Sequence, residues 1–168
     1  MHRRFNSVPL MGPWGLGLIL FLIGSGAFAM SEDSYYLAPC PASPNCVCSD
    51  EPETSPRYIA PIVSAGADGK VGGQDDARLL LAGIATYLSQ QPGYDVTHLT
   101  EDQLRAEGTT RLLRFVDDLE FRVRSGSVVV RSASRVGFSD LGKNRRRLEA
   151  LRRAMIDQGF ALPRSAPL

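Results

Sequence analysis

Residues 112–135 read LLRFVDDLEFRVRSGSVVVRSASR, and this stretch decides the fold that the sequence predicts. Apolar and charged side chains alternate before a Ser-Gly pair, and the β-branched run Val128–Val130 follows it, which is typical of two antiparallel strands joined by a tight turn. With this turn, Phe121 faces Val130 and Glu120 faces Arg131. A shift by one residue would put Phe121 opposite Arg131 and destroy the apolar face, so the sequence favours the first register.

The segments around this hairpin predict an α+β fold. The middle strands follow one another without the long crossover segments that parallel strands need, so the pairing is expected to be antiparallel. The sequence predicts an antiparallel sheet of about four to five strands with two helices packed on one face. The expected elements are strands at about 58–63, 95–99, 103–109, 112–124 and 127–135, with helices over 75–91 and from Asp140 or Asn144 to about Gln158.

The N-terminal segment has the pattern of an export signal. Arg3 and Arg4 precede an apolar run, and Ala27-Phe28-Ala29 offers the small side chains that signal peptidase requires. The same run could instead stay in the inner membrane as an anchor. Both interpretations place the rest of the chain in the periplasm or another exported compartment. The expected parts are residues 1–29 as a signal peptide or N-terminal membrane anchor (residues 8–30 if it is uncleaved), 30–56 as an extended disulfide-tied arm, 57–160 as a single α+β domain and 161–168 as a tail.

Three cysteines lie close together in the arm. A Cys40–Cys46 bond would close a loop stiffened by two prolines, whereas Cys46–Cys48 would make a tighter, strained ring, so the spacing favours the first pairing. An oxidising compartment permits this disulfide. A metal site made of the three cysteines and His98 is disfavoured, because structural zinc motifs space their ligands differently. We therefore expect one disulfide, an odd thiol and no metal.

Charged side chains form a cross-strand set on one face of the hairpin. Asp118 and Glu120 project away from the apolar face, and Asp118 lies diagonal to Arg131 and Arg135. An exposed ion pair contributes about 0.2–1 kcal/mol, whereas a buried Leu or Phe contributes about 1.5–3 kcal/mol. These pairs therefore do not hold the fold together; they either order a solvated hairpin or serve a site.

Asp117 lies on the apolar face, level with Ser134. A carboxylate there needs hydrogen-bond donors, which Ser132, Ser134 or the start of the second helix could supply. Asn144 lies on the apolar stripe of that helix, so the sequence predicts a polar network that ties the hairpin to the helix. The stripe comprises Leu141, Asn144, Leu148, Leu151 and Met155, and the arginines at 145, 146, 147, 152 and 153 are expected to be mostly solvated.

The residues do not form the usual catalytic sets. A serine hydrolase needs a base beside its nucleophile, but no G-x-S-x-G segment occurs and His98 is the only histidine after the N-terminal segment. Asp117 and Asp118 project to opposite faces, which argues against a simple acid–base pair. Nucleic acid is excluded as a partner because the domain is expected to be exported and no aromatic residues interleave with the arginines. No cofactor is expected.

The hairpin, the segment before it and the start of the second helix resemble an uncharacterised family, the domain of unknown function 1499. The segments that carry the resemblance are CPASPNCVCS with the following YIAPI, then LRAEGTTRLLRFVDDLEFRV, then VVVRSASRVGFSDLGKNRRRLEALR, spanning about 40–153. The family implies an exported, membrane-anchored or lumenal protein without an agreed activity. Similar sequences often have serine where this chain has Cys48, which supports the Cys40–Cys46 pairing. The positions that match the family's motifs are Asp117, Asp118, Glu120, Arg131, Ser132, Ser134, Arg135, Asp140, Asn144 and Arg145.

Three functional hypotheses follow. The first is a non-enzymatic binding or assembly-support module, in which Arg131, Arg135 and Arg145 act with Asp118 and Glu120 on an unknown protein or a small anionic ligand. The second is a small periplasmic hydrolase that uses Asp117 or Asp118 with Ser134. The third is a purely structural polar network. In each case, membrane contact is expected only through the N-terminal segment, and only if that segment is uncleaved.

Overall fold

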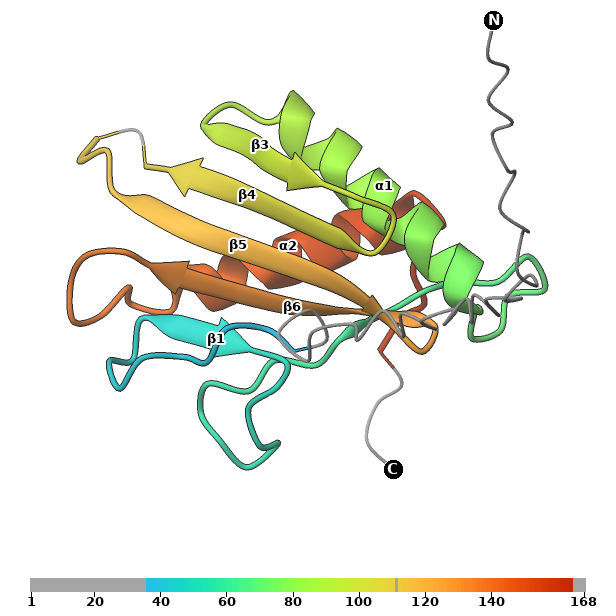
Figure 1. Ribbon diagram of the computed structural model, residues 1–168, viewed down its shortest axis with the longest axis horizontal. Coiled ribbons are helices and arrows are strands. Elements are labelled where there is room, and N and C mark those ends of the chain that lie inside the picture. The colour runs from blue at the N-terminus through green and yellow to red at the C-terminus, as the bar shows by residue number, and fades with distance from the viewer. Residues whose placement is uncertain (1–35, 111, 165–168) are drawn as a thin grey trace, which may run out of the picture. The chain divides into compact units, whose positions relative to one another are not determined.

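The protein is described by a computed structural model that covers residues 36–110 and 112–164 (Figure 1). The expected signal or anchor, residues 1–29, lies outside the described residues. The unit Ser31–Leu168 is compact and contains every described helix and strand. In the described part of the chain, no helix combines the length and the hydropathy that crossing a bilayer requires.

The fold is α+β, as predicted: an antiparallel sheet with two helices. The sheet has six strands in the order β1-β6-β5-β4-β3, and β2 also pairs with β6. Both helices lie behind the sheet in the view of Figure 1. The strands are β1 Cys46–Cys48, β2 Ile62–Val63, β3 Tyr94–Leu99, β4 Gln103–Thr109, β5 Val116–Arg124 and β6 Ser127–Ser134, and the helices are α1 Gln74–Gln90 and α2 Lys143–Asp157.

The β5–β6 hairpin has the predicted register. Phe121 pairs with Val130, and Glu120 pairs with Arg131. The turn places both of its central residues in the left-handed region, with φ of +48° at Ser125 and +76° at Gly126. This backbone twist matches the twist of the strands that it joins.

Local differences from the sequence-based prediction have identifiable causes. β5 starts at Val116, because the chain before it turns, with the Phe115 amide donating to Thr110 Oγ1 at 2.9 Å. The first expected strand shortens to β2, which begins directly after Pro61, a residue without an amide donor. The arm contains a strand that was not predicted, β1, which pairs with β6. The expected tail is tied at its start, since the Leu162 amide donates to the Val63 carbonyl at 3.0 Å.

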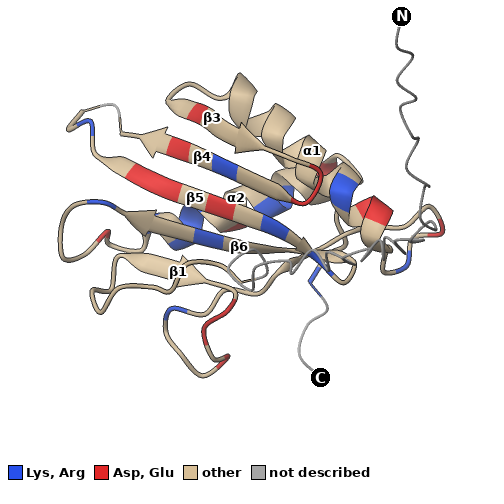
Figure 2. Cartoon of the chain, in the orientation of Figure 1, with Lys and Arg blue, Asp and Glu red and all other residues tan. Residues whose placement is uncertain are grey.

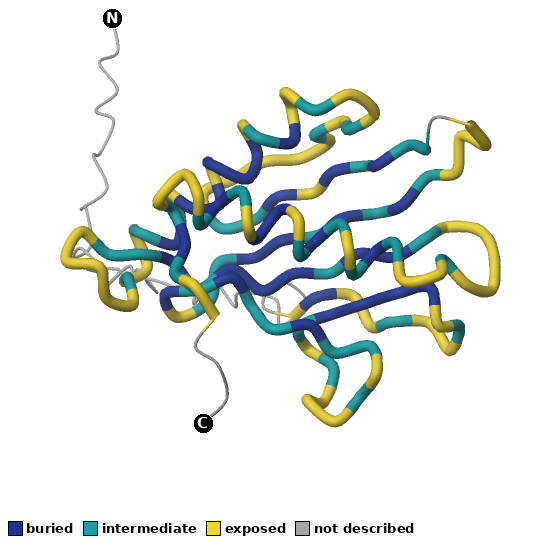
Figure 3. Tube along the Cα trace, turned by 180° about the vertical axis from the view of Figure 1, so that it is seen from behind, coloured by how far each residue is buried: buried dark blue, intermediate teal, exposed yellow. Residues whose placement is uncertain are grey.

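The core lies between the sheet and the two helices, as the buried faces of these elements in Figure 3 indicate. Helical spacing predicts an apolar stripe on α1, and this stripe is buried, with only Tyr87 partly exposed. Its members are Leu80, Leu81, Ile84, Tyr87 and Leu88. One prediction for α2 is wrong: Leu141 precedes the helix and is 84% exposed, so it is no part of the buried stripe. The fully buried large side chains include Leu80, Leu81, Ile84, Leu88, Leu104, Leu119, Phe121, Leu148 and Met155.

The arm contains the predicted Cys40–Cys46 disulfide. Cys48 is a free, buried thiol in β1. Burial raises the pKa of this thiol, so little of it is present as the reactive thiolate at neutral pH.

Candidate functional site

Asp117 is the buried carboxylate at the centre of a polar network between β5 and α2. Asp117 is 2% exposed. Its carboxylate accepts a hydrogen bond from Arg147 and lies 3.5 Å from Lys143 Nζ. Burial alone raises the pKa of Asp117, but hydrogen bonds from Ser134 and Arg147, with the charges of Arg147 and Lys143, outweigh it and hold the pKa below its usual value. Asp117 is therefore an ionised structural acceptor at neutral pH.

Asn144 connects this carboxylate region to the arm. Its Oδ1 accepts from Ser132 Oγ at 2.7 Å and from Arg147 Nη1 at 2.8 Å. Its Nδ2 donates to the Asn45 carbonyl at 2.8 Å and to Ser134 Oγ at 3.1 Å. Because both atoms of the buried amide are satisfied by fixed partners, this arrangement holds β6, α2 and the arm in one geometry.

The start of α2 is held by Asp140. Its carboxylate accepts from the Gly142 amide at 3.0 Å and from the Asn144 amide at 2.7 Å. A carboxylate at this position satisfies amides that have no partner within the helix and complements the positive end of the helix dipole. The helix itself begins at Lys143, after Gly142 with φ of +74°.

The opposite face of the sheet carries the exposed ion pairs. Arg135 Nε donates to Asp118 Oδ1 at 3.0 Å, and its Nη2 also bonds to Glu107. Arg131 Nη1 donates to Glu120 Oε1 at 2.8 Å. Figure 2 shows acidic and basic positions on the neighbouring strands β4, β5 and β6. The hydrogen bonds to Asp118 and Glu107 raise the pKa of Arg135, which keeps this guanidinium charged and paired.

The ten residues singled out by the sequence do not share one centre, because the sheet lies between two groups of them. Arg145 belongs to neither group, since its Nη2 donates to the carbonyls of Pro56 at 2.8 Å and Tyr58 at 2.7 Å. The helix-side group is Asp117, Ser132, Ser134, Asp140 and Asn144, and the group on the open face is Asp118, Glu120, Arg131 and Arg135.

The expectation that the α2 arginines are mostly solvated is wrong for two of them. The side chains of Arg147 and Arg152 are only 9% and 6% exposed. Arg152 donates to the carbonyls of Ala60 and Pro61, and burial lowers its pKa. Arg147 lies three residues after Asn144 and therefore faces the sheet, a spacing that the sequence displays.

A cleft opens beside this network, between β3, the β4–β5 loop and the start of α2. It encloses about 590 Å³, and the residues that line it include three cations but no carboxylate. Tyr94 forms one wall, with its hydroxyl accepting from Arg147 Nε at 3.1 Å. Gly108 leaves room for this contact, because a Cβ there would lie 3.2 Å from the Tyr94 ring and 3.4 Å from Arg147 Cζ. The lining residues are Pro92, Tyr94, Gly108, Thr109, Thr110, Leu112, Lys143, Arg146 and Arg147.

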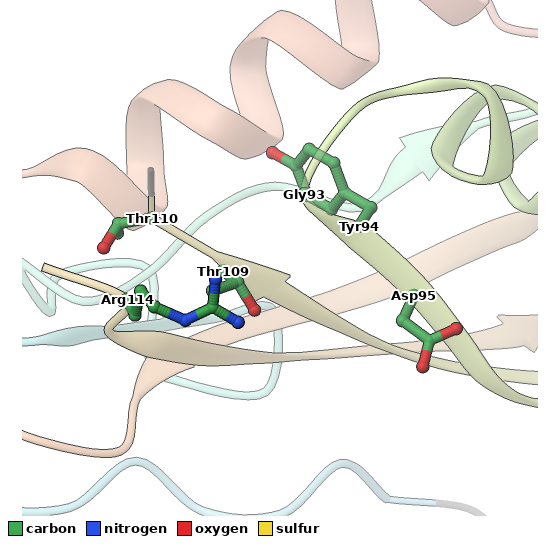
Figure 4. A pocket seen from close by; sticks show the side chains of 6 residues that line it. All are labelled: Gly93, Tyr94, Asp95, Thr109, Thr110 and Arg114. Atoms are coloured by element: carbon green, nitrogen blue, oxygen red, sulfur yellow. The ribbon is translucent and has the colours of Figure 1, made fainter. Parts of the chain in front are cut away.

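A second hollow of about 420 Å³ adjoins the first and shares Tyr94, Thr109 and Thr110 with it (Figure 4). Arg114 extends along Thr109 in this view, and Asp95 lies farther along β3. We call these two adjoining hollows, which share three lining residues, the groove. Sequence reasoning missed the groove because its walls come from β3, β4, one loop and α2, which only the tertiary fold brings together.

The geometry of the serine and carboxylate groups gives no support to hydrolysis. Ser134 bonds to Asp117, but this carboxylate is held by Arg147 with a lowered pKa and is therefore a poor proton acceptor. Neither residue lines the groove. Within residues 36–110 and 112–164, no three metal-ligating side chains are grouped closely enough to hold an ion.

The comparisons with known proteins give a single finding. The model of a family described as "Protein of unknown function (DUF1499)" matches residues 36–155, which include every described strand and most of α2. Neither the search of curated proteins nor the search of solved structures gave a match.

Proposed function

The chain belongs to the DUF1499 family of proteins of unknown function, and from this premise we propose that it is a non-enzymatic domain that binds an anionic ligand in the groove beside Tyr94. The observation that carries the proposal is the composition of the larger cleft. Three cations line it and no carboxylate does, while the buried Asp117 behind Lys143 and Arg147 carries a single negative charge. Tyr94 and Leu112 add apolar surface. Such a wall favours a ligand that combines a negative group with an apolar part.

Two of the three cations have capacity for a ligand. Arg146 donates from Nη1 to the Leu141 carbonyl at 2.8 Å and forms no ion pair with any described carboxylate. Lys143 Nζ is 3.5 Å from Asp117, which already accepts from Arg147. Arg147 already donates to Asp117, Asn144 and the Tyr94 hydroxyl, so it fixes the groove wall and contributes positive charge to it. An anion placed between Lys143 and Arg146 would gain two charge-assisted contacts.

The guanidinium groups proposed from the sequence are less suitable. Arg131 and Arg135 are paired with carboxylates on the open face, and Arg145 donates to two carbonyls. An external anion at Arg131 or Arg135 would have to displace a carboxylate, whereas Arg146 donates to a single carbonyl oxygen. The groove is therefore the better candidate for a binding site.

The proposal includes an exported location. The Cys40–Cys46 disulfide supports it, because such bonds persist in oxidising compartments. The basic start and the A-x-A pattern of the N-terminal segment favour the same location.

Titration calorimetry with phenyl phosphate tests the groove, since this probe carries an anionic group and an aromatic ring. We expect saturable binding of one probe per chain and no comparable binding of phenol, the neutral analogue. Lys143→Gln and Arg146→Gln should each weaken binding about tenfold. Arg153→Gln is the matched control, because Arg153 is exposed on the same helix but lines no part of the groove. Equal binding of phenol, or unchanged affinity in the two groove variants, contradicts the proposal.

A further inference from the structure

Exposed apolar side chains are concentrated in two loops of the described chain. Ten large apolar residues are exposed, and six of them belong to the β4–β5 loop or the β6–α2 loop. Single exposed apolar residues are ordinary, but a concentration of this kind indicates an interaction surface. We call this surface the apolar end; it comprises Leu112, Leu113, Phe115, Val136, Phe138 and Leu141.

The two loops lie at the same end of the sheet. β4 ends at Thr109, opposite Val116, and β6 ends at Ser134, opposite Asp117. Both loops therefore leave the sheet at the same end of its strands. The Arg135 amide donates to the Val116 carbonyl at 3.0 Å and joins their bases. Figures 1 and 3 both show the loops projecting from one end of the domain.

The fold gains nothing from the apolar identity of these residues. Leu112 is 90% exposed and Phe138 is 78% exposed, so neither contributes to the core. Leu141 is 84% exposed and has φ of +52°, a left-handed conformation that leucine rarely adopts. These three side chains are therefore available for a contact beyond the core.

Positive charge surrounds the apolar end. Arg114 lies between Leu113 and Phe115 in the first loop and forms no ion pair with any described carboxylate. Lys143 and Arg146 lie at the start of α2, directly after the second loop. The nearby acids include Asp140, whose carboxylate accepts from two amides at the start of α2, and Asp95, which lines the same hollow as Arg114. The surface that remains is apolar at the loop tips and cationic behind them.

We propose that the apolar end docks on an anionic lipid bilayer, with the loop tips among the lipid headgroups and the cations at the level of the phosphates. Two projecting loops with exposed Leu and Phe fit a fluid interface, which closes around them as a flat protein surface does not. Basic residues behind the tips complement the negative surface potential of such a bilayer. This contact goes beyond the sequence-based expectation, in which only the N-terminal segment touches a membrane, and it does not depend on the ligand of the groove.

Vesicle co-sedimentation of the Ser31–Leu168 unit tests the proposal, because this compact unit has its own core and lacks the N-terminal segment. We expect binding to vesicles of equal parts phosphatidylcholine and phosphatidylglycerol, weak binding to phosphatidylcholine alone, and a loss of binding as salt is added. The double variant Leu112→Ser/Phe138→Ser should bind at least about tenfold more weakly. Leu79→Ser is its matched control, since Leu79 is 62% exposed on α1, away from both loops.

The charge component has its own pair of variants. Arg114→Gln should weaken vesicle binding about fivefold, as expected for one basic residue at an anionic surface, while Arg153→Gln leaves it unchanged. The proposal is overturned if neither vesicle is bound. It is also overturned if the loop variant binds as wild type does, or if Leu79→Ser loses as much. Failure of phenyl phosphate to bind would refute the groove proposal and leave these outcomes unaffected.

Discussion

Replacing Asp117 by Asn tests whether the buried network stabilises the fold. Asn keeps the size of the side chain but removes the charge that Arg147 and Lys143 face. Removing one partner of a buried ion pair costs about 3–5 kcal/mol because the other charge remains buried. Arg147 retains the Tyr94 hydroxyl, Ser132 Oγ and Asn144 Oδ1 as acceptors, so we expect the low end, about 3 kcal/mol.

Urea unfolding at neutral pH measures this loss. With a slope of about 2 kcal/mol per M, the midpoint should fall by about 1.5 M while the slope stays unchanged. Asp118→Asn is the matched control, because it makes the same chemical change one residue away on the open face. Its carboxylate is 39% exposed and pairs with an exposed arginine, so its loss should be much smaller. A midpoint shift at 117 no larger than that at 118 refutes the assignment of a structural network.

The pH dependence of stability gives a second test of the same residue. The folded-state pKa of Asp117 lies below its usual value of about 3.9, so its contribution to stability is complete above that value. The contribution is lost as the pH falls from the usual value through the folded-state pKa. The stability difference between wild type and Asp117→Asn should therefore be constant near neutral pH and shrink below about pH 4. A difference that grows on acidification would contradict the lowered pKa.

Two further predictions concern the arm and the hairpin turn. Reduction of the Cys40–Cys46 bond should lower the free energy of unfolding by about 2 kcal/mol, as measured by urea unfolding with and without reductant. In the native state, the buried Cys48 should not be alkylated by iodoacetamide. Gly126→Ala should destabilise by about 2–3 kcal/mol, because φ is +76° and the new Cβ would lie 2.3 Å from a backbone carbonyl oxygen. Gly69→Ala is the control in thermal unfolding, since Gly69 has a similar φ but nothing within 4 Å, and an equal loss there would rule out the steric explanation.

The parts of the fold that the sequence predicted are those set by local periodicity. The register of the hairpin follows from the two-residue alternation around its turn, and the buried stripe of α1 follows from helical spacing. The same alternation was misleading at 112–115, where apolar residues belong to an exposed loop. Strand β1 could not be predicted, because three residues of an irregular arm become a strand only by pairing with β6.

The sequence predicted the polar network only in part, for a related reason. Asp117 and Ser134 were placed level from the register alone, but their third partner, Arg147, comes from a helix whose docking is not a local property. The position of Arg147, three residues after Asn144, indicates that it shares the buried face of the helix. This indication is hard to recognise, because arginines also occupy the neighbouring positions. The groove had no such signal, since its walls come from four separate segments.

The distribution of partners among the arginines restricts where this protein can bind a negative charge. Arg131 and Arg135 are paired on the open face, and Arg147 is held by Asp117. An arginine already paired with an internal carboxylate must lose that ion pair before it binds an external anion, and the loss offsets much of the gain. Arg114 and Arg146 form no ion pair with a carboxylate of the described chain, and both lie where the groove meets the apolar end. If the removal of these two charges left the binding of phenyl phosphate and of anionic vesicles unchanged, neither proposed binding site at this end of the sheet would stand.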